Sequence, residues 1–124
     1  MKDKLDSMFI MRKEFMEALS QKVDDAYPAI PLDLSKKSDQ RFCRDIALRG
    51  VEEMFEALQH LKNWKPHRQT NVEGFDREEF LEEIVDAFNY FFSLLILTDV
   101  DSQELFEAYA KKDATIHKRL SDGY

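Results

Sequence analysis

The chain has 124 residues, of which 44% are hydrophobic and 35% are charged, and its net charge is −7. That length predicts a single domain over residues 1–124, with enough apolar material for a modest core. The acidic balance argues against the basic face that a nucleic-acid-binding module or a protein bound to anionic lipid would show, so we expect neither nucleic acid nor a membrane as partner.

The remaining global features favour a cytoplasmic protein. The charged segment 1–4 has no apolar stretch behind it that would make a signal peptide. The longest apolar run, Tyr90–Leu97, is too short to cross a bilayer. Cys43 is the single cysteine, which excludes an internal disulfide, and its helical context favours a buried small side chain over a reactive thiol.

Helical periodicity predicts an all-α fold. Apolar residues recur at helical spacing, alternating strand patterns are absent, and only three glycines and three prolines are available for turns. We expect helices over about 5–25, from 35 or 38 to about 61, after an N-cap at Asp76, and over about 103–120. Together they would form a four- to five-helix bundle.

The first and third expected helices carry more apolar surface than one small bundle requires. An adaptable surface on the first comprises Met8, Phe9, Met11 and Met16. Core or dimer packing is favoured for this surface over a ligand pocket. The third helix is apolar nearly all round after Phe88, which is typical of a central helix or of one buried again in a dimer. This excess predicts a homodimer.

Two pairs of carboxylates stand on two different expected helices. Glu53 and Glu56 share one face of the second helix, and Glu83 and Asp86 share one face of the third. If the four converge they repel one another, and Mg²⁺ relieves that repulsion through oxygen ligands. On the second helix alone, a solvated charged face is the favoured explanation. Asp86 enters the apolar half of its helix, where an unpaired carboxylate is costly, so a metal site becomes the favoured interpretation overall.

The segment between these two helices is basic and aromatic. It contains Lys62, Trp64 and Lys65, and Pro66 and Gly74 break helical structure within it. One interpretation is a loop whose lysines contact phosphates while the Trp64 ring stacks on a base. The alternative, slightly favoured when the loop is considered alone, is that Trp64 covers the end of the bundle and the cations are solvated.

The histidines do not predict a metal site of their own. A di-iron helical bundle requires a Glu-x-x-His motif on two helices, and neither acidic helix has one. We therefore expect His60, His67 and His117 to be surface side chains.

Taken in order, these motifs resemble the dimeric all-α dUTPase and dCTPase family, within the wider all-α NTP pyrophosphatase (MazG-type) group. The resemblance covers about residues 45–124. The matching parts are Glu53-x-x-Glu56, Lys62-x-Trp64-Lys65, Glu83-x-x-Asp86, Tyr109-x-x-Lys112-Asp113, Arg119 and Gly123-Tyr124. Each acidic motif is weakly specific by itself, whereas their order around the tryptophan loop is far more specific.

The resemblance implies a Mg²⁺-dependent hydrolase that cleaves a deoxynucleoside triphosphate to the monophosphate and pyrophosphate. Glu53, Glu56, Glu83 and Asp86 would be the catalytic and metal-binding carboxylates, and one glutamate would orient or deprotonate the attacking water. The phosphates would be neutralised by Lys62, Lys65, Lys112 and Arg119. The base and sugar would contact Trp64, Asn89, Tyr109 and Asp113.

The chain departs from the family in its last helix. Where this chain has Asp113 and Ile116, the family usually has Asn, and where it has Leu120, the family usually has Gln. Pyrophosphohydrolase activity is therefore a firmer expectation than base preference, for which dUTP comes first and dCTP second. The departures keep two alternatives open, a non-catalytic or regulatory helical interaction protein and a broad-specificity house-cleaning pyrophosphatase.

Overall fold

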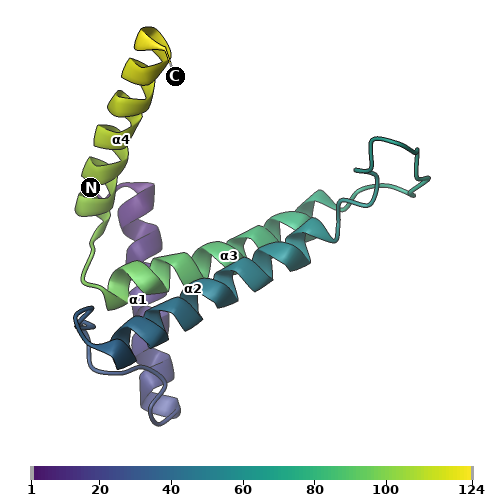
Figure 1. Ribbon diagram of the computed structural model, residues 1–124. Coiled ribbons are helices and arrows are strands. Elements are labelled where there is room, and N and C mark those ends of the chain that lie inside the picture. Colours follow the sequence, from purple (N-terminus) through teal and green to yellow (C-terminus); the bar gives the residue numbers. More distant parts are fainter. Residues whose placement is uncertain (1, 124) are drawn as a thin grey trace. The chain divides into compact units, whose positions relative to one another are not determined.

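The computed structural model describes residues 2–123 and is built from helices (Figure 1). These are α1 (Lys4–Lys22), α2 (Lys37–Leu58), α3 (Arg77–Leu97) and α4 (Ser102–Asp122). The described residues contain no strand. The all-α prediction is therefore confirmed, and every expected helix is present. Tyr124, which the family resemblance used, lies outside the described residues.

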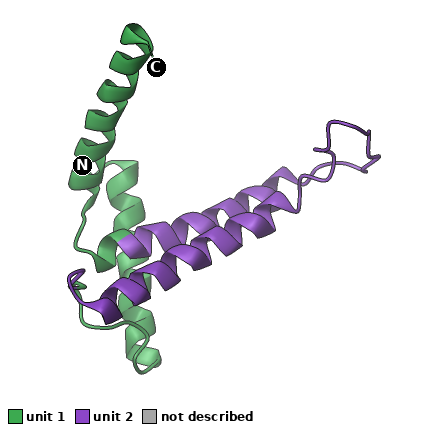
Figure 2. Ribbon diagram, in the orientation of Figure 1, with its two compact units in different colours: residues 1–32, 95–124 green, residues 33–94 purple. Residues whose placement is uncertain are grey.

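The chain divides into two compact units (Figure 2). Residues 33–94 form one unit, which contains α2, the following loop and most of α3. Residues 1–32 and 95–124 form the other, which contains α1 and α4. All four predicted metal ligands belong to the 33–94 unit.

Aspartates start three of the helices. The Asp76 side chain accepts a hydrogen bond from the Glu79 N–H at 3.0 Å, which confirms the predicted cap of α3. Asp3 caps α1 and Asp101 caps α4 through the same type of bond, each at 2.8 Å. Because such caps depend on residues three apart, they can be found from sequence.

In the 33–94 unit, α2 and α3 run antiparallel and lie side by side (Figure 1). The buried residues of α2 are Ile46, Gly50 and Ala57. A Cβ atom on Gly50 would lie 3.0 Å from Cζ of Phe91, so the ring occupies the space that a larger residue would need. Ala57 and Ala87 are both fully buried. Small residues therefore allow the two helices to approach closely.

In the other unit, α1 buries Phe9 and Met16, at 7% and 2% exposure. Met8 and Met11 remain exposed, so of the predicted adaptable surface only these two side chains are free to pack against a partner. The Leu32 N–H donates to the Leu97 carbonyl at 2.7 Å and joins the segment after α1 to the end of α3. Among the described residues, no helix combines the length and the apolar character needed to span a membrane.

Candidate functional site

Three carboxylates from two helices converge in the 33–94 unit. Glu53 and Glu56 of α2 and Glu83 of α3 each offer an oxygen, and these oxygens lie within 4.8 Å of one another. We refer to these three residues as the carboxylate cluster. Asp86 is close enough for its charge to raise the pKa of both Glu53 and Glu83. The structure therefore brings together the acidic residues that the sequence selected.

The register of the helix pair explains why the cluster forms. Glu53 lies between Gly50 and Ala57 on the buried line of α2, and Glu83 lies one turn before Ala87 of α3. At these positions a helix pair ordinarily carries apolar side chains. Glu53 and Glu83 are accordingly half-buried. They are not part of a simple solvated face, which was the alternative explanation for α2.

The cluster concentrates negative charge that no ion pair within residues 2–123 neutralises. Burial, followed by repulsion from Glu56, raises the pKa of Glu53 and likewise that of Glu83. The charge of His60 acts in the opposite direction and lowers the pKa of Glu83. The nearby Arg49 pairs with Asp45 at 3.0 Å, and no lysine or arginine among the described residues pairs with the cluster. Several converging oxygens with uncompensated charge fit the ligand preference of Mg²⁺.

The predicted burial of Asp86 is wrong. Its side chain is exposed, and Ala87 takes the buried position beside α2. The physical reason is rotational, since each residue turns by about 100° on a helix and its neighbour therefore faces another direction. Asp86 lies at the solvent edge of the carboxylate cluster, whereas Asn89 is half-buried one turn along α3.

His60 lies in a setting that the sequence did not reveal. It was expected at the surface, but it is half-buried and its ring meets Phe80 edge-on, with centroids 6.4 Å apart. One of its nitrogens lies within 4.8 Å of carboxylate oxygens of Glu79 and Glu83. The available signal was its position one turn after Glu56, in a helix expected to pair with another acidic helix. His67 and His117 are exposed, as predicted.

The loop presents its aromatic ring, Lys62 and Arg68 to solvent, whereas Lys65 is half-buried. Trp64 is 69% exposed, and Nζ of Lys65 lies 5.7 Å from the centre of its ring. This exposure contradicts the idea that Trp64 covers the end of the helix pair. A hollow of about 660 Å³ next to it is lined by Lys62, Lys65 and Arg68, together with apolar side chains, and by no acidic residue. Arg68, the arginine of the basic loop, is a further candidate anion contact.

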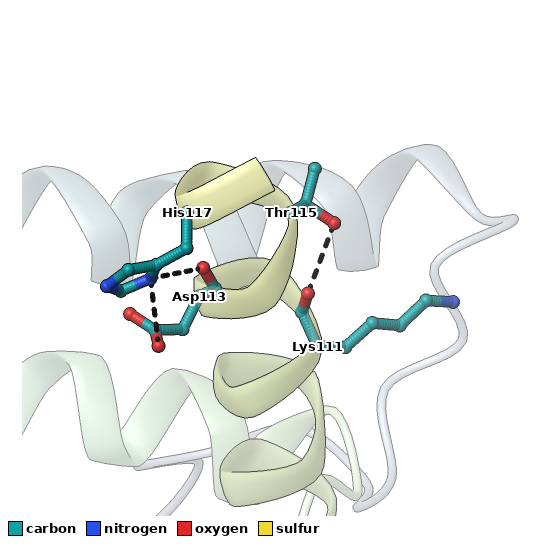
Figure 3. A network of polar contacts seen from close by, with 4 residues as sticks. All are labelled: Lys111, Asp113, Thr115 and His117. Carbon is teal, nitrogen blue, oxygen red and sulfur yellow. Dashed lines mark hydrogen bonds and ion pairs between the residues drawn. The ribbon is translucent and has the colours of Figure 1, made fainter. Parts of the chain in front are cut away.

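The remaining predicted site residues, Tyr109, Lys112, Asp113 and Arg119, are exposed on α4. Figure 3 shows that Asp113 interacts within its own helix. Nδ1 of His117 lies 2.9 Å from the Asp113 carbonyl oxygen and 3.4 Å from its carboxylate. The Thr115 hydroxyl donates to the Lys111 carbonyl at 3.2 Å. A contribution of α4 to the acidic site stays a prediction.

No protein-family model, no curated protein and no solved structure matches this chain.

Proposed function

We propose that the protein is a Mg²⁺-dependent pyrophosphohydrolase of deoxynucleoside triphosphates, with dUTP as the first expected substrate and dCTP as the second. The observation that carries this proposal is the carboxylate cluster, in which two helices direct uncompensated carboxylates at a common point. The order of the acidic and tryptophan motifs, which resembles the all-α dUTPase and dCTPase family, supplies the substrate class.

Glu53, Glu56, Glu83 and Asp86 are the residues that would hold Mg²⁺. Bound there, the ion would neutralise phosphate charge and orient the triphosphate. Glu53 and Glu83 are both suited to accept a proton from water, because burial and neighbouring carboxylates raise the pKa of each. The water oxygen would form a bond to phosphorus as the α–β bridging bond breaks, which gives the monophosphate and pyrophosphate.

The cations of the loop would receive the substrate's negative charge. Lys62 lines both the hollow beside Trp64 and a second hollow of about 1140 Å³ that includes His60 and Glu79. It therefore connects the tryptophan loop with the acidic end of the helix pair. Lys65 and Arg68 add two further cations, and Lys112 and Arg119 of α4 are the expected additional phosphate contacts.

A homodimer is part of the proposal, and the 33–94 unit carries a surface suited to it. Large apolar side chains with exposed fractions of 42–60% follow one side of each helix. They are Leu48, Val51, Phe55 and Leu58 of α2, and Leu81, Val85 and Phe88 of α3. Large exposed apolar patches mark protein–protein interaction sites on soluble proteins. A second copy of the chain is the partner that we propose for this apolar surface.

The decisive experiment incubates the protein with each nucleoside triphosphate and Mg²⁺ and identifies the products by ³¹P NMR. We expect monophosphate plus pyrophosphate. Diphosphate plus orthophosphate would refute the proposed cleavage. Glu53→Gln should abolish turnover, whereas Glu52→Gln, which removes the same charge from an exposed neighbour, should leave it unchanged.

Two alternatives have defined outcomes in the same experiments. Similar rates for all triphosphates would favour a broad-specificity house-cleaning pyrophosphatase. A non-catalytic or regulatory interaction protein is favoured by the departures at Asp113, Ile116 and Leu120. It predicts that calorimetry detects no coupled binding of Mg²⁺ and nucleotide.

A further inference from the structure

A second group of possible metal ligands lies next to the carboxylate cluster, on the side of the loop. His60, Glu79 and Glu83 each offer one ligand atom, and these atoms lie within 4.8 Å of one another. We call these three residues the mixed cluster, because it combines an imidazole nitrogen with carboxylate oxygens. Glu83 belongs to both clusters.

Local structure fixes the backbone at His60 and Glu79 of the mixed cluster. The His60 N–H donates to the Ala57 carbonyl at 3.1 Å, in the turn that ends α2. The Glu79 N–H donates to the capping Asp76 side chain at 3.0 Å, in the first turn of α3. The Phe80 ring meets the imidazole edge-on, at an interplanar angle of 71°, and limits the orientation of the half-buried ring. The cluster is therefore held on two helix ends rather than on a free loop.

The spacing of the mixed cluster suits a shared ion better than direct pairing. Within the part of the chain that the structure describes, the imidazole forms no ion pair or hydrogen bond with either carboxylate. Ligand atoms about 2.1 Å from one metal ion lie about 3–4 Å apart, so small side-chain rotations would complete the coordination. His60 and Glu79 also line the hollow of about 1140 Å³, which gives an ion access to them.

The donor set distinguishes this position from the carboxylate cluster. Mg²⁺ prefers oxygen ligands and keeps several waters, whereas an imidazole combined with carboxylates suits manganese, iron, cobalt, nickel or zinc. We propose that His60, Glu79 and Glu83 form a second metal position, which takes a divalent transition-metal ion and shares Glu83 with the carboxylate cluster. This position does not depend on nucleotide hydrolysis.

The test titrates the full chain with Mn²⁺ without nucleotide and measures free Mn²⁺ by electron paramagnetic resonance. We expect two bound ions per wild-type chain. His60→Asn and Glu79→Gln should each remove one, or weaken it at least tenfold. The matched controls are His67→Asn in the loop and Glu78→Gln beside Glu79, and both should bind as the wild type does. Excess Mg²⁺ should displace Mn²⁺ from the carboxylate cluster more readily than from the mixed cluster.

Circular dichroism checks that each variant remains helical. If His60→Asn unfolds, Glu79→Gln decides the question, because the Glu79 side chain is exposed and its cap uses only backbone N–H. Wild-type stoichiometry and affinity in Glu79→Gln would overturn the second position, as would a single bound ion that both His60→Asn and Glu79→Gln retain. Failure of the proposed hydrolase would appear instead in the product analysis with nucleotide, which this titration does not use.

Discussion

Replacing Glu53 with Gln should change stability in opposite directions with and without Mg²⁺. In the metal-free protein, Glu53 has two carboxylates with oxygens within 4.8 Å, and no cation of the described part of the chain pairs with it. Two unit charges at that distance repel by about 0.9 kcal/mol in water and more at lower dielectric. Because the side chains can move apart and salt screens them, we expect a net gain in the free energy of unfolding of about 1 kcal/mol. For a domain of this size, that corresponds to a rise in Tm of about 3–6 °C.

Mg²⁺ should reverse this order. An ion at a hundredfold excess over its Kd stabilises the wild-type fold by about 2.7 kcal/mol, and Glu53→Gln removes one of the ligands that provide this stabilisation. The wild type should then melt above the variant. The assay is thermal unfolding by circular dichroism, at one protein concentration, in EDTA and in Mg²⁺. Glu52→Gln is the matched control, because it removes an adjacent but exposed carboxylate. The reasoning fails if Glu53→Gln and Glu52→Gln respond alike in both conditions.

Three further outcomes follow from the structure. Val85→Glu should convert the proposed dimer to monomers, as measured by multi-angle light scattering, whereas Val72→Glu, at a loop site of nearly equal exposure, should not. Equal masses for the two variants would contradict this interface. Trp64 is the only tryptophan of the sequence, so nucleotide binding should quench the protein's tryptophan fluorescence. Trp64→Ala should weaken nucleotide binding about 5- to 100-fold, as expected for the loss of one base stack. An unchanged Kd would show that Trp64 does not contact the nucleotide. Because folding raises the pKa of Glu53 and Glu83, their contribution to metal-free stability is present below pH 4.5 and is lost as the pH rises through their raised pKa values. The affinity for Mg²⁺ should increase over the same pH range. If the stability difference between the wild type and the doubly Gln-substituted protein does not change with pH, this sign is wrong.

Local patterns were sufficient to predict the helices. Caps such as Asp76 and Asp101 act on an N–H three residues away, so the printed order of residues contains the whole interaction. The pairing of Glu53 with Glu56 is equally local. The expectation that a second acidic helix would meet the first came from the carboxylate pair Glu83 and Asp86, and the structure does bring Glu83 to Glu53 and Glu56.

Features that depend on helix register were not predictable in this way. The burial of Asp86 was predicted wrongly because Ala87, not Asp86, faces α2, and that choice follows from how Gly50 and Phe91 fit together. The setting of His60 was missed because Phe80 and Glu79 approach it only after α2 and α3 pair. Residues so far apart in the sequence show no periodic signal that links them.

The contact between Gly50 and Phe91 has a consequence for how the protein meets an ion. On one side of the carboxylate cluster the helices are held by that contact, and on the other by the packing of His60 against Phe80. These contacts on both flanks oppose a separation of the two backbones that would ease the repulsion between Glu53 and Glu83. The acidic groups are therefore preorganised. Cation binding should change the rate of amide hydrogen exchange near the carboxylate cluster and leave that rate unchanged at the ends of α2 and α3 that lie far from it.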